Sequence, residues 1–395
     1  SPPPPTQDMV LGRSLKLQCP NPHARRVAGC PMSRDASIAT LRRHIDRLDD
    51  QILRLLNQRA ALGLRIGAQK ARTQRQVYDP VRETTILKRI LRGNEGPLRT
   101  EHLRAIYREI LSAGRAVQEA PAVTYFGPEG TYTHLAAQAH FGEAVRYQPV
   151  TTIGEVFADV ERGRADLGVV PVENSTEGMV ALTLDLLLES SLRIHAEISL
   201  PIHHCRLGRP GWTRASVRRG VAHPQALAQC RQWLAVHLPG VECREAASNA
   251  SAAADAARST RTAAIAAAAT GARYQLALLA ENVQDHARNT TRFLVLAATD
   301  CETPSGDDKT SLLFSVRDEV GILFRMLEPF ARHRIALIKI ESRPLRERPW
   351  EYYFFLDLKG HRREPRVRRA LADAEARALR LKVLGSYPAA PEVAG

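Results

Sequence analysis

The chain has 395 residues and a formal net charge of +14, from 56 Lys plus Arg against 42 Asp plus Glu. This length predicts two or three domains at about 150 residues each. The composition is that of a globular protein, and no apolar run reaches the roughly 18 residues that a membrane span needs.

The cationic residues are spread over every segment, without a helix-turn-helix, zinc-finger or RNA-binding signature, which argues against nucleic acid as a partner. The same excess of cations suits an enzyme that binds small dianionic substrates. The six cysteines lie far apart, with no C-x-x-C pair and no metal-ligand spacing, so we interpret them as free thiols of a reducing cytosol. We therefore expect a cytoplasmic protein that holds no metal and no other cofactor. The cysteines are Cys19, Cys30, Cys205, Cys230, Cys243 and Cys301.

Residues 1–31 are rich in Pro and scattered Arg and follow neither a helical nor a strand period. We predict a disordered extension here. The segment lacks the apolar stretch of a signal peptide, and Met32, just before the first patterned segment, is our candidate for the natural start.

Residues 32–120 read as helices. From Ala36 to Lys70, Leu and Ile recur at steps of three and four, which predicts one long amphipathic helix. Shorter helices are predicted near 81–91 and 100–117. Three helices of such unequal length cannot enclose a core, so we expect a second copy of the chain to complete this unit.

Several charged residues of this unit have spacings that bring them to common helix faces. Arg59 and Lys70 lie only about 20° apart around the helix. Asp79, Arg82 and Glu83 share a face at i, i+3 and i+4. A solvated helix with surface ion pairs is the alternative explanation of such spacing.

The segments 41–50, 57–59, 67–70 and 77–83, with the tail to Gln118, together resemble the all-helical chorismate mutase family. The resemblance implies that three arginines bind the two carboxylates of chorismate, one of them supplied by a partner subunit. It also implies hydrogen bonds to the ether oxygen and to the ring hydroxyl. The implied residues are Arg42 (from the partner), Arg59 and Arg82 for the carboxylates, Lys70 and Gln118 for the ether oxygen, and Asp79 and Glu83 for the hydroxyl. Gly114 departs from the small polar residue that relatives commonly carry, so any substrate contact there must be replaced or absent.

Residues 121–303 alternate short apolar runs with Ala-rich helical segments, which indicates an α/β unit with helices on both sheet faces and a ligand at the strand ends. The predicted strands are 123–126, 167–172, 193–200, 263–268 and 293–297. Four polar strings adjoin predicted elements. Residues 127–131 follow a strand and precede a helix, and they either bind an anion through backbone N–H groups or form a plain tight turn. The other strings are 172–175 with Gly178, 223–225 before a helix, and 289–293 before a strand.

With residues 248–250 and 264–266, these strings resemble the prephenate dehydratase family, and the triplet Thr291-Arg292-Phe293 is the most specific mark. The resemblance implies two lobes like those of periplasmic binding proteins, with prephenate in the cleft. It assigns Thr291 as the hydrogen-bond donor to the departing hydroxyl. The implied substrate-binding residues are Thr131, Asn174, Ser175 and Arg292. From chemistry alone, Arg292 either binds a carboxylate or pairs with a buried acid.

Residues 304–395 predict strand, helix, strand, strand, helix, strand, which is the ferredoxin-like βαββαβ arrangement. The strings 320–323 and 341–344 resemble the ACT domain, which implies phenylalanine bound between paired modules. Gly321 permits a close backbone approach, although Val320 and Ile322 replace the Pro and Ala that usually flank it. A purely structural dimer module is the alternative. The implied effector site is Gly321, Ile322, Leu323, Glu341, Ser342, Arg343 and Pro344.

The whole chain thus resembles the bifunctional chorismate mutase/prephenate dehydratases of phenylalanine biosynthesis, feedback-inhibited by phenylalanine and assembled as a homodimer or larger homo-oligomer. Two rivals remain open at this point. One is a non-catalytic amino-acid sensor, and the other is a dehydratase whose mutase unit is impaired by Gly114.

Overall fold

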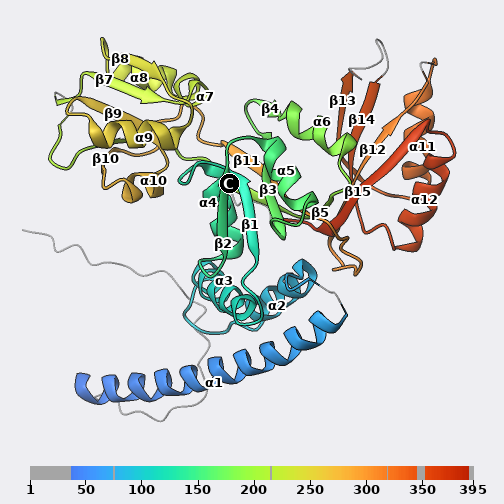
Figure 1. Ribbon diagram of the computed structural model, residues 1–395, viewed down its shortest axis with the longest axis horizontal. Coiled ribbons are helices and arrows are strands. Elements are labelled where there is room, and N and C mark those ends of the chain that lie inside the picture. The colour runs from blue at the N-terminus through green and yellow to red at the C-terminus, as the bar shows by residue number, and fades with distance from the viewer. Residues whose placement is uncertain (1–36, 74–75, 214–215, 318, 345–351, 391–395) are drawn as a thin grey trace, which may run out of the picture.

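The computed structural model describes residues 37–390 except 74–75, 214–215, 318 and 345–351 (Figure 1). The predicted disordered extension at 1–31 lies outside the described residues. No helix in the described ranges is long and apolar enough to cross a membrane. The four cysteines that the structure describes are free thiols, and only Cys243 among them is exposed.

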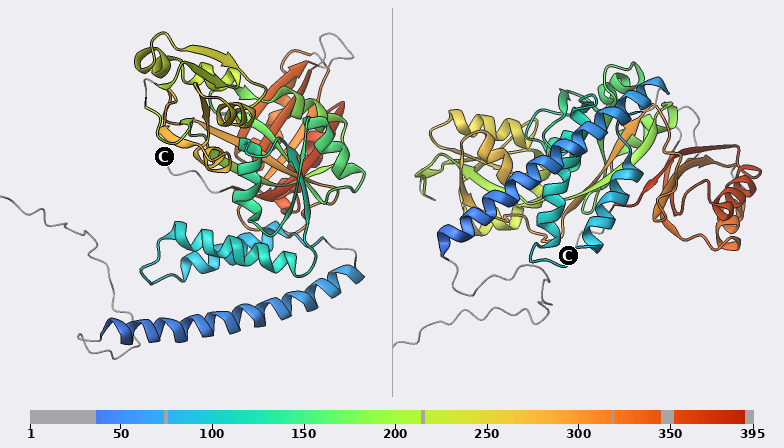
Figure 2. Two further views of the ribbon diagram at one scale, coloured as in Figure 1. Left: turned by 60° about the vertical axis from the view of Figure 1, so that its left-hand side comes forward. Right: turned by 90° about the horizontal axis from the view of Figure 1, so that it is seen from below.

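The three predicted helices are confirmed: α1 (Ile38–Arg72), α2 (Pro80–Arg92) and α3 (Thr100–Ala116). Helices α2 and α3 lie between α1 and the remainder of the molecule (Figures 1 and 2). Every residue of α1 is described and none is buried, so its row of Leu and Ile side chains faces outward. The large apolar side chains that α1 leaves exposed are Ile38, Leu41, Ile45, Leu48, Ile52, Leu53, Leu55, Leu56, Leu62, Leu64 and Ile66.

Glycines let α1 approach the end of α3 closely. A Cβ atom at Gly67 would lie 2.9 Å from Cγ of Gln118, and one at Gly63 would lie 3.7 Å from the carbonyl oxygen of Gly114. A larger residue at position 67 would push the two helices apart.

Residues from Ala122 onward form two sheets, each with its own helices. In the first sheet, β1, β2 and β3 run parallel and β11 runs antiparallel between β3 and β5. Its strands, in sheet order, are β2 (Arg146–Val150), β1 (Ala122–Phe126), β3 (Leu167–Asn174), β11 (Thr290–Ala297) and β5 (Arg193–Pro201), with β4 (Gly178–Met179) paired to β3. Its helices are α4 (Tyr132–Phe141), α5 (Ile153–Glu161) and α6 (Ala181–Glu189).

The second sheet is inserted between β5 and β11, so two chain segments connect the two lobes. Its strands, in sheet order, are β10 (Ala277–Ala280), β6 (Cys205–Gly208), β9 (Thr262–Ala266), β7 (Arg219–Ala222) and β8 (Glu242–Glu245). Its helices are α7 (Pro224–Gln229), α8 (Arg231–His237), α9 (Asn249–Arg258) and α10 (Ala268–Arg273).

Three predicted strand limits in residues 121–303 were wrong by two residues or more. Strand β3 continues to Asn174, two residues beyond its predicted end. Strand β9 ends at Ala266 because α10 begins at Ala268. Strand β11 begins at Thr290, three residues before the predicted start, so Thr291 and Arg292 lie within it. Three polar side chains at its start hid the pairing of this segment with β3 and β5.

The C-terminal βαββαβ order is confirmed, and its sheet has the strand order β13-β14-β12-β15. The elements are β12 (Asp308–Ser315), α11 (Ile322–Arg332), β13 (Leu337–Pro344), β14 (Tyr352–Lys359), α12 (Pro365–Glu375) and β15 (Arg380–Pro388). Side chains such as Phe314, Met326, Phe330 and Val367 form one core between this sheet and its two helices.

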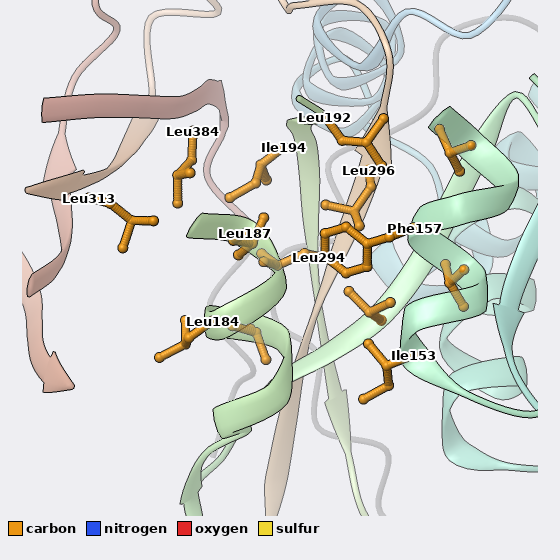
Figure 3. Packing of buried hydrophobic residues seen from close by; sticks show 14 of the residues in the cluster. Ile153, Phe157, Leu184, Leu187, Leu192, Ile194, Leu294, Leu296, Leu313 and Leu384 are labelled. Atoms are coloured by element: carbon orange, nitrogen blue, oxygen red, sulfur yellow. The ribbon is translucent and has the colours of Figure 1, made fainter. Parts of the chain in front are cut away.

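The other face of this C-terminal sheet packs directly on the first lobe. Leu313 and Leu384 belong to the same buried cluster as Leu187 and Ile194, as Figure 3 shows. A Cβ at Gly385 would lie 2.3 Å from the carbonyl oxygen of Ile194, so the two backbones nearly touch. The C-terminal module therefore shares a core with the first lobe.

The helical region is anchored to the same lobe from another side. Tyr78, in the loop before α2, is 5% exposed and lies in a cluster with Val123, Phe141 and Val295. Its hydroxyl is 2.6 Å from Nε2 of His140. The three parts of the chain are thus joined by buried side chains.

Candidate active sites

The first candidate site lies where α1 meets α3. Arg59 donates a hydrogen bond from Nη1 to the carbonyl oxygen of Ile110 at 3.2 Å, and Gln118 donates from Nε2 to the carbonyl oxygen of Gly114 at 2.8 Å. A Cβ at Gly114 would lie 2.7 Å from Nη1 of Arg59. The guanidinium of Arg59 therefore fills the space beside residue 114, which gives a physical reason for glycine there.

The other charged residues of this site come from the end of α1 and the start of α2. Lys70 donates from Nζ to the carbonyl oxygen of Val77 at 2.8 Å. Asp79 caps α2 by accepting from the backbone N–H of Arg82 at 2.9 Å, and Arg82 itself is exposed. Glu83 is paired with Arg115. Burial raises the pKa of Glu83 above its usual value, and the positive charge of Arg115 opposes that rise.

Arg42 lies apart from the other predicted members of this site. It lies on α1, 17 residues before Arg59, which is about 25 Å along a helix at 1.5 Å per residue. The side chain is exposed near the opposite end of α1.

The second candidate site surrounds Thr291, whose hydroxyl has a defined orientation. Asn174 accepts from the backbone N–H groups of Thr176 and Glu177 at its Oδ1, at 3.0 and 3.2 Å. Because a backbone N–H only donates, this fixes which end of the amide is oxygen. Nδ2 of Asn174 then donates to Oγ1 of Thr291 at 2.9 Å. The Thr291 oxygen is thus an acceptor, and its own proton remains available for a further partner.

Four side chains beside Thr291 form a closed ring of hydrogen bonds that all run in one direction. Asn174 donates to Oδ1 of Asn289 at 2.8 Å, and Asn289 donates to Oε1 of Gln229 at 2.9 Å. Gln229 donates to Oγ1 of Thr176 at 3.0 Å, and Thr176 donates back to Oδ1 of Asn174 at 2.6 Å. Gln229 ends α7 of the second lobe, so the ring joins the two lobes.

His204 extends this ring. Its Nε2 is 2.9 Å from Oε1 of Gln229, and because that oxygen only accepts, Nε2 carries the proton. Nδ1 of His204 is 3.0 Å from the hydroxyl of Tyr132. Burial lowers the pKa of His204, which favours the neutral ring.

Sequence reasoning missed most of this network. Asn289 lies in the polar string 289–293 that the sequence analysis names. The other members of the network were not assigned to the site; they are Tyr132, Thr176, His204 and Gln229. Tyr132, Thr176 and Gln229 lie within a few residues of the four polar strings, whereas His204 lies near none of them. The ring exists because two lobes meet, and no spacing along the chain encodes that contact.

Thr131 and Ser175 make local contacts. Thr131 caps α4 and donates to the carbonyl oxygen of Pro128 at 2.9 Å. The N–H of Gly130 donates to Nδ1 of His134 at 3.1 Å, so the contacts of this loop are those of the tight turn that was the alternative reading. Ser175 accepts from the N–H of Thr290 at 3.0 Å and is exposed.

Arg292 points to the face of β11 opposite Thr291, as alternation along a strand requires. Its Nη2 lies 2.7 Å from Oδ2 of Asp357, and Glu173 and Glu197 each lie 3.7 Å from the guanidinium. Burial acts to lower the pKa of Arg292, but the combined effect of Asp357, Tyr387 and Glu197 outweighs burial and raises it. The expected substrate-binding role is therefore corrected: Arg292 pairs with buried acids, the second of its two alternatives.

These charges belong to a larger group at the junction with the C-terminal module, which we call the joint cluster. Lys309 of β12 binds Glu197 at 2.7 Å, and Lys339 of β13 binds Glu173. Ser311 donates to the fully buried Asp357 at 2.5 Å. The joint cluster consists of Glu173, Glu197, Arg292, Lys309, Lys339 and Asp357, so three acids face three bases.

The residues expected to bind an effector lie at the start of α11 and at the end of the edge strand β13. Gly321 caps α11 with a positive φ of 77°, a conformation that favours glycine. Ile322 and Leu323 begin α11, and residues 341–344 end the edge strand β13. Arg343 is paired with Asp185 of α6 at 3.2 Å, so it contacts the first lobe.

Replacing Asp357 by Asn should destabilise the chain strongly, because Arg292 would then be buried without its nearest acid. Breaking a buried pair from one side costs about 3–5 kcal/mol. The midpoint temperature of thermal unfolding of Asp357→Asn should therefore lie well below that of the parent. Glu242→Gln, which breaks an exposed pair with Arg219 and Arg244, is the matched control and should leave the midpoint unchanged. Equal midpoints for Asp357→Asn and the parent would contradict this account.

Three family models match the chain in order: Chorismate mutase type II over residues 41–119, Prephenate dehydratase over 123–301, and the ACT domain over 310–376. A bifunctional chorismate mutase/prephenate dehydratase of Aquifex aeolicus is 46% identical over 89% of this chain and 97% of its own length. Among solved structures, a prephenate dehydratase from Arthrobacter aurescens in complex with L-Phe is 34% identical, with a TM-score of 0.63 over 68% of this chain and 89% of its own.

A chain described as GqqA, a novel type of quorum quenching acylases, is 31% identical with the same TM-score over 68% of this chain and 98% of its own. Neither solved chain covers much more than two thirds of this one, whereas the Aquifex relative spans nearly all of it. The three matched regions occur in the order of this family, and the similarity to the Aquifex relative extends over nearly the whole chain. The chain therefore belongs to the bifunctional chorismate mutase/prephenate dehydratase family.

Proposed function

We propose that this chain isomerises chorismate to prephenate and then converts prephenate to phenylpyruvate, carbon dioxide and water, with phenylalanine as feedback inhibitor. The second conversion consumes one proton, because the ring hydroxyl leaves as water. The observation that carries the proposal is the orientation of Thr291, whose hydroxyl accepts from Asn174 and therefore offers its proton elsewhere. The four cysteines within the described ranges are free thiols, which supports a reducing, cytoplasmic setting.

The rearrangement of chorismate needs no nucleophile. One C–O bond breaks as one C–C bond forms, and negative charge grows on the ether oxygen, so confinement and fixed positive charge suffice. We assign Lys70 and Gln118 to that oxygen, and Arg59 with Arg82 to the carboxylates. Asp79 and Glu83 would accept from the ring hydroxyl. Gly114 would make no side-chain contact, because Arg59 fills the space beside it.

Arg42 would come from a partner subunit. The apolar row of α1 supports this pairing, since exposed apolar surface of this extent marks an interaction site. A second α1 laid against the first would cover those side chains and bring the partner's Arg42 toward the Arg59 end of the helix.

For the dehydratase step, Thr291 would donate a hydrogen bond to the departing ring hydroxyl. Electrons of the C–COO⁻ bond move into the ring as carbon dioxide leaves, and the ring becomes aromatic. A threonine hydroxyl is a weak acid, so its role is to stabilise the growing negative charge, and Asn174 keeps its oxygen in place. Thr131 and Ser175 complete the proposed contacts. Arg292 is left out, because acids on the opposite face hold it.

Inhibition by phenylalanine would act through pairing of two C-terminal modules. Val320 and Phe324 beside Gly321 are 99% and 74% exposed, and Leu337, Ile338 and Ile340 on the edge strand β13 are exposed too. Such an apolar edge suits another copy of the same module. The Arthrobacter relative was solved with L-Phe, which supports this choice of ligand.

Mixing Arg42→Ala subunits with Arg59→Ala subunits should restore mutase activity that neither variant has alone. In a mixed dimer one site receives both substitutions and the other receives none. Random exchange makes half of the dimers mixed, so about one quarter of parental activity should return. Chorismate consumption after subunit exchange measures this recovery. Arg59→Ala subunits taken alone through the same exchange are the control. No recovery despite proven exchange would contradict a shared site.

Changing Thr291 to Val keeps the volume but removes the donor, so dehydratase kcat should fall about 10²- to 10³-fold. Mutase activity should persist. Coupled assays of chorismate consumption and phenylpyruvate formation measure both, and they also separate the enzyme from a sensor without activity. Thr290→Val, the neighbour on the other face of β11, is the matched control. Near-parental dehydration by Thr291→Val would refute the assignment.

Gly321→Val should leave dehydration intact but weaken its inhibition by phenylalanine, raising the half-inhibitory concentration about tenfold or more. A β-branched residue at this positive φ is strained and obstructs the backbone approach. Gly306→Val, at a φ of 85° in another loop, controls for strain alone. Unchanged inhibition of Gly321→Val would place the effector site elsewhere. Removing the whole module is a poor test, since Leu313 and Leu384 are part of the shared core.

A further inference from the structure

Arg115, in the last turn of α3, is a buried cation at the junction between the helical region and the first lobe. It is 3% exposed. One side of its guanidinium pairs with Glu83 through Nη1, and Nη2 donates to the carbonyl oxygen of Phe141 at 2.5 Å. The guanidinium carbon lies 5.8 Å from the ring centroids of both Tyr78 and Phe141.

The carbonyl group that accepts from Nη2 of Arg115 lies at the end of a helix. Phe141 is the last residue of α4, and the final carbonyl groups of a helix have no partner within it. Arg115 satisfies this carbonyl with one N–H group while another meets Glu83. A flexible cation is thereby fixed at two points, one in the first lobe and one on α2.

We propose that Arg115 is a positioning residue for the chorismate rearrangement: it keeps the Glu83 carboxylate ionised and aimed, and Phe141 of the dehydratase lobe fixes it for that task. The inference rests on the proposed function, in which Glu83 accepts from the ring hydroxyl. It adds a residue that does not touch the substrate, and it makes the first lobe part of the mutase site.

The electrostatic surroundings support this role. Burial raises the pKa of Glu83, and Arg115 is the largest influence that lowers it, so loss of the guanidinium would leave the acid protonated nearer neutral pH. Lys70 also lowers that pKa and Asp79 raises it, both more weakly. Tyr78 and Tyr147, whose pKa values burial raises, and His140, whose pKa burial lowers to about 4, also lie near this pair and are neutral at pH 7. Burial acts to raise the pKa of Glu109, but hydrogen bonds from Glu143 and Arg108 outweigh burial and lower it, so this acid is ionised.

The test is the pH profile of mutase activity in the full-length chain. In Arg115→Met, kcat/KM for chorismate at pH 7 should fall about 10- to 100-fold, the size expected for losing a hydrogen bond to a charged group. The logarithm of kcat/KM should then rise with pH as Glu83 ionises. The pH profile of the parent should lack this rising limb. Dehydratase activity on prephenate should be retained, which shows that the chain is folded.

Three further chains make the result decisive. Arg115→Lys keeps the charge and should recover part of the activity without the new limb. Arg108→Met, two turns earlier on the same helix and paired with Glu109 near the surface, should match the parent. Arg115→Met combined with Glu83→Gln should lose the limb. Parental mutase activity in Arg115→Met, or an equal and pH-independent loss in Arg115→Met and Arg115→Lys, would overturn the inference. A parent that does not isomerise chorismate would refute the proposed function instead.

Discussion

The ion pair between Arg292 and Asp357 is the contact on which the arrangement of the dehydratase part depends. Arg292 and Thr291 are neighbours on β11 and face opposite sides of the sheet. One side meets the hydrogen-bonded ring between the two lobes, and the other meets the joint cluster at the C-terminal module. A single strand therefore carries both the proposed catalytic hydroxyl and the anchor of the regulatory module. Any displacement of that module acts on the backbone that holds Thr291.

The junction with the helical region follows the same principle. Here too a buried arginine, Arg115, joins an acid of one part to the backbone of another, and the aromatic ring of Tyr78 fills the adjoining core. Buried ion pairs contribute little net stability but are costly to break from one side. Both junctions therefore favour a single relative placement of parts of the chain that the sequence predicts to be separate domains.

The sequence predicted the regular elements well where a periodic pattern extended over many residues. The Leu and Ile steps of α1 and the βαββαβ order of the last module were read correctly, because each pattern runs over many residues. Strands such as β7 and β8 were missed, since four-residue strands carry too little alternation. The partners of Arg292 and Gln229 were not predictable either. Periodicity assigns a side chain to a face, but only tertiary packing decides what that face meets.

The ring around Asn174 has one further consequence. Two backbone N–H groups of the first lobe set the direction of the Asn174 amide, whereas the two ring bonds that involve Gln229 cross between the lobes. If the lobes separate, two of the four links break together, while the bonds from Asn174 to Asn289 and to Thr291 remain within the first lobe. The Thr291 hydroxyl therefore keeps its polarity whether the lobes are together or apart, and their approach adds Gln229 beside an acceptor that the first lobe has already set.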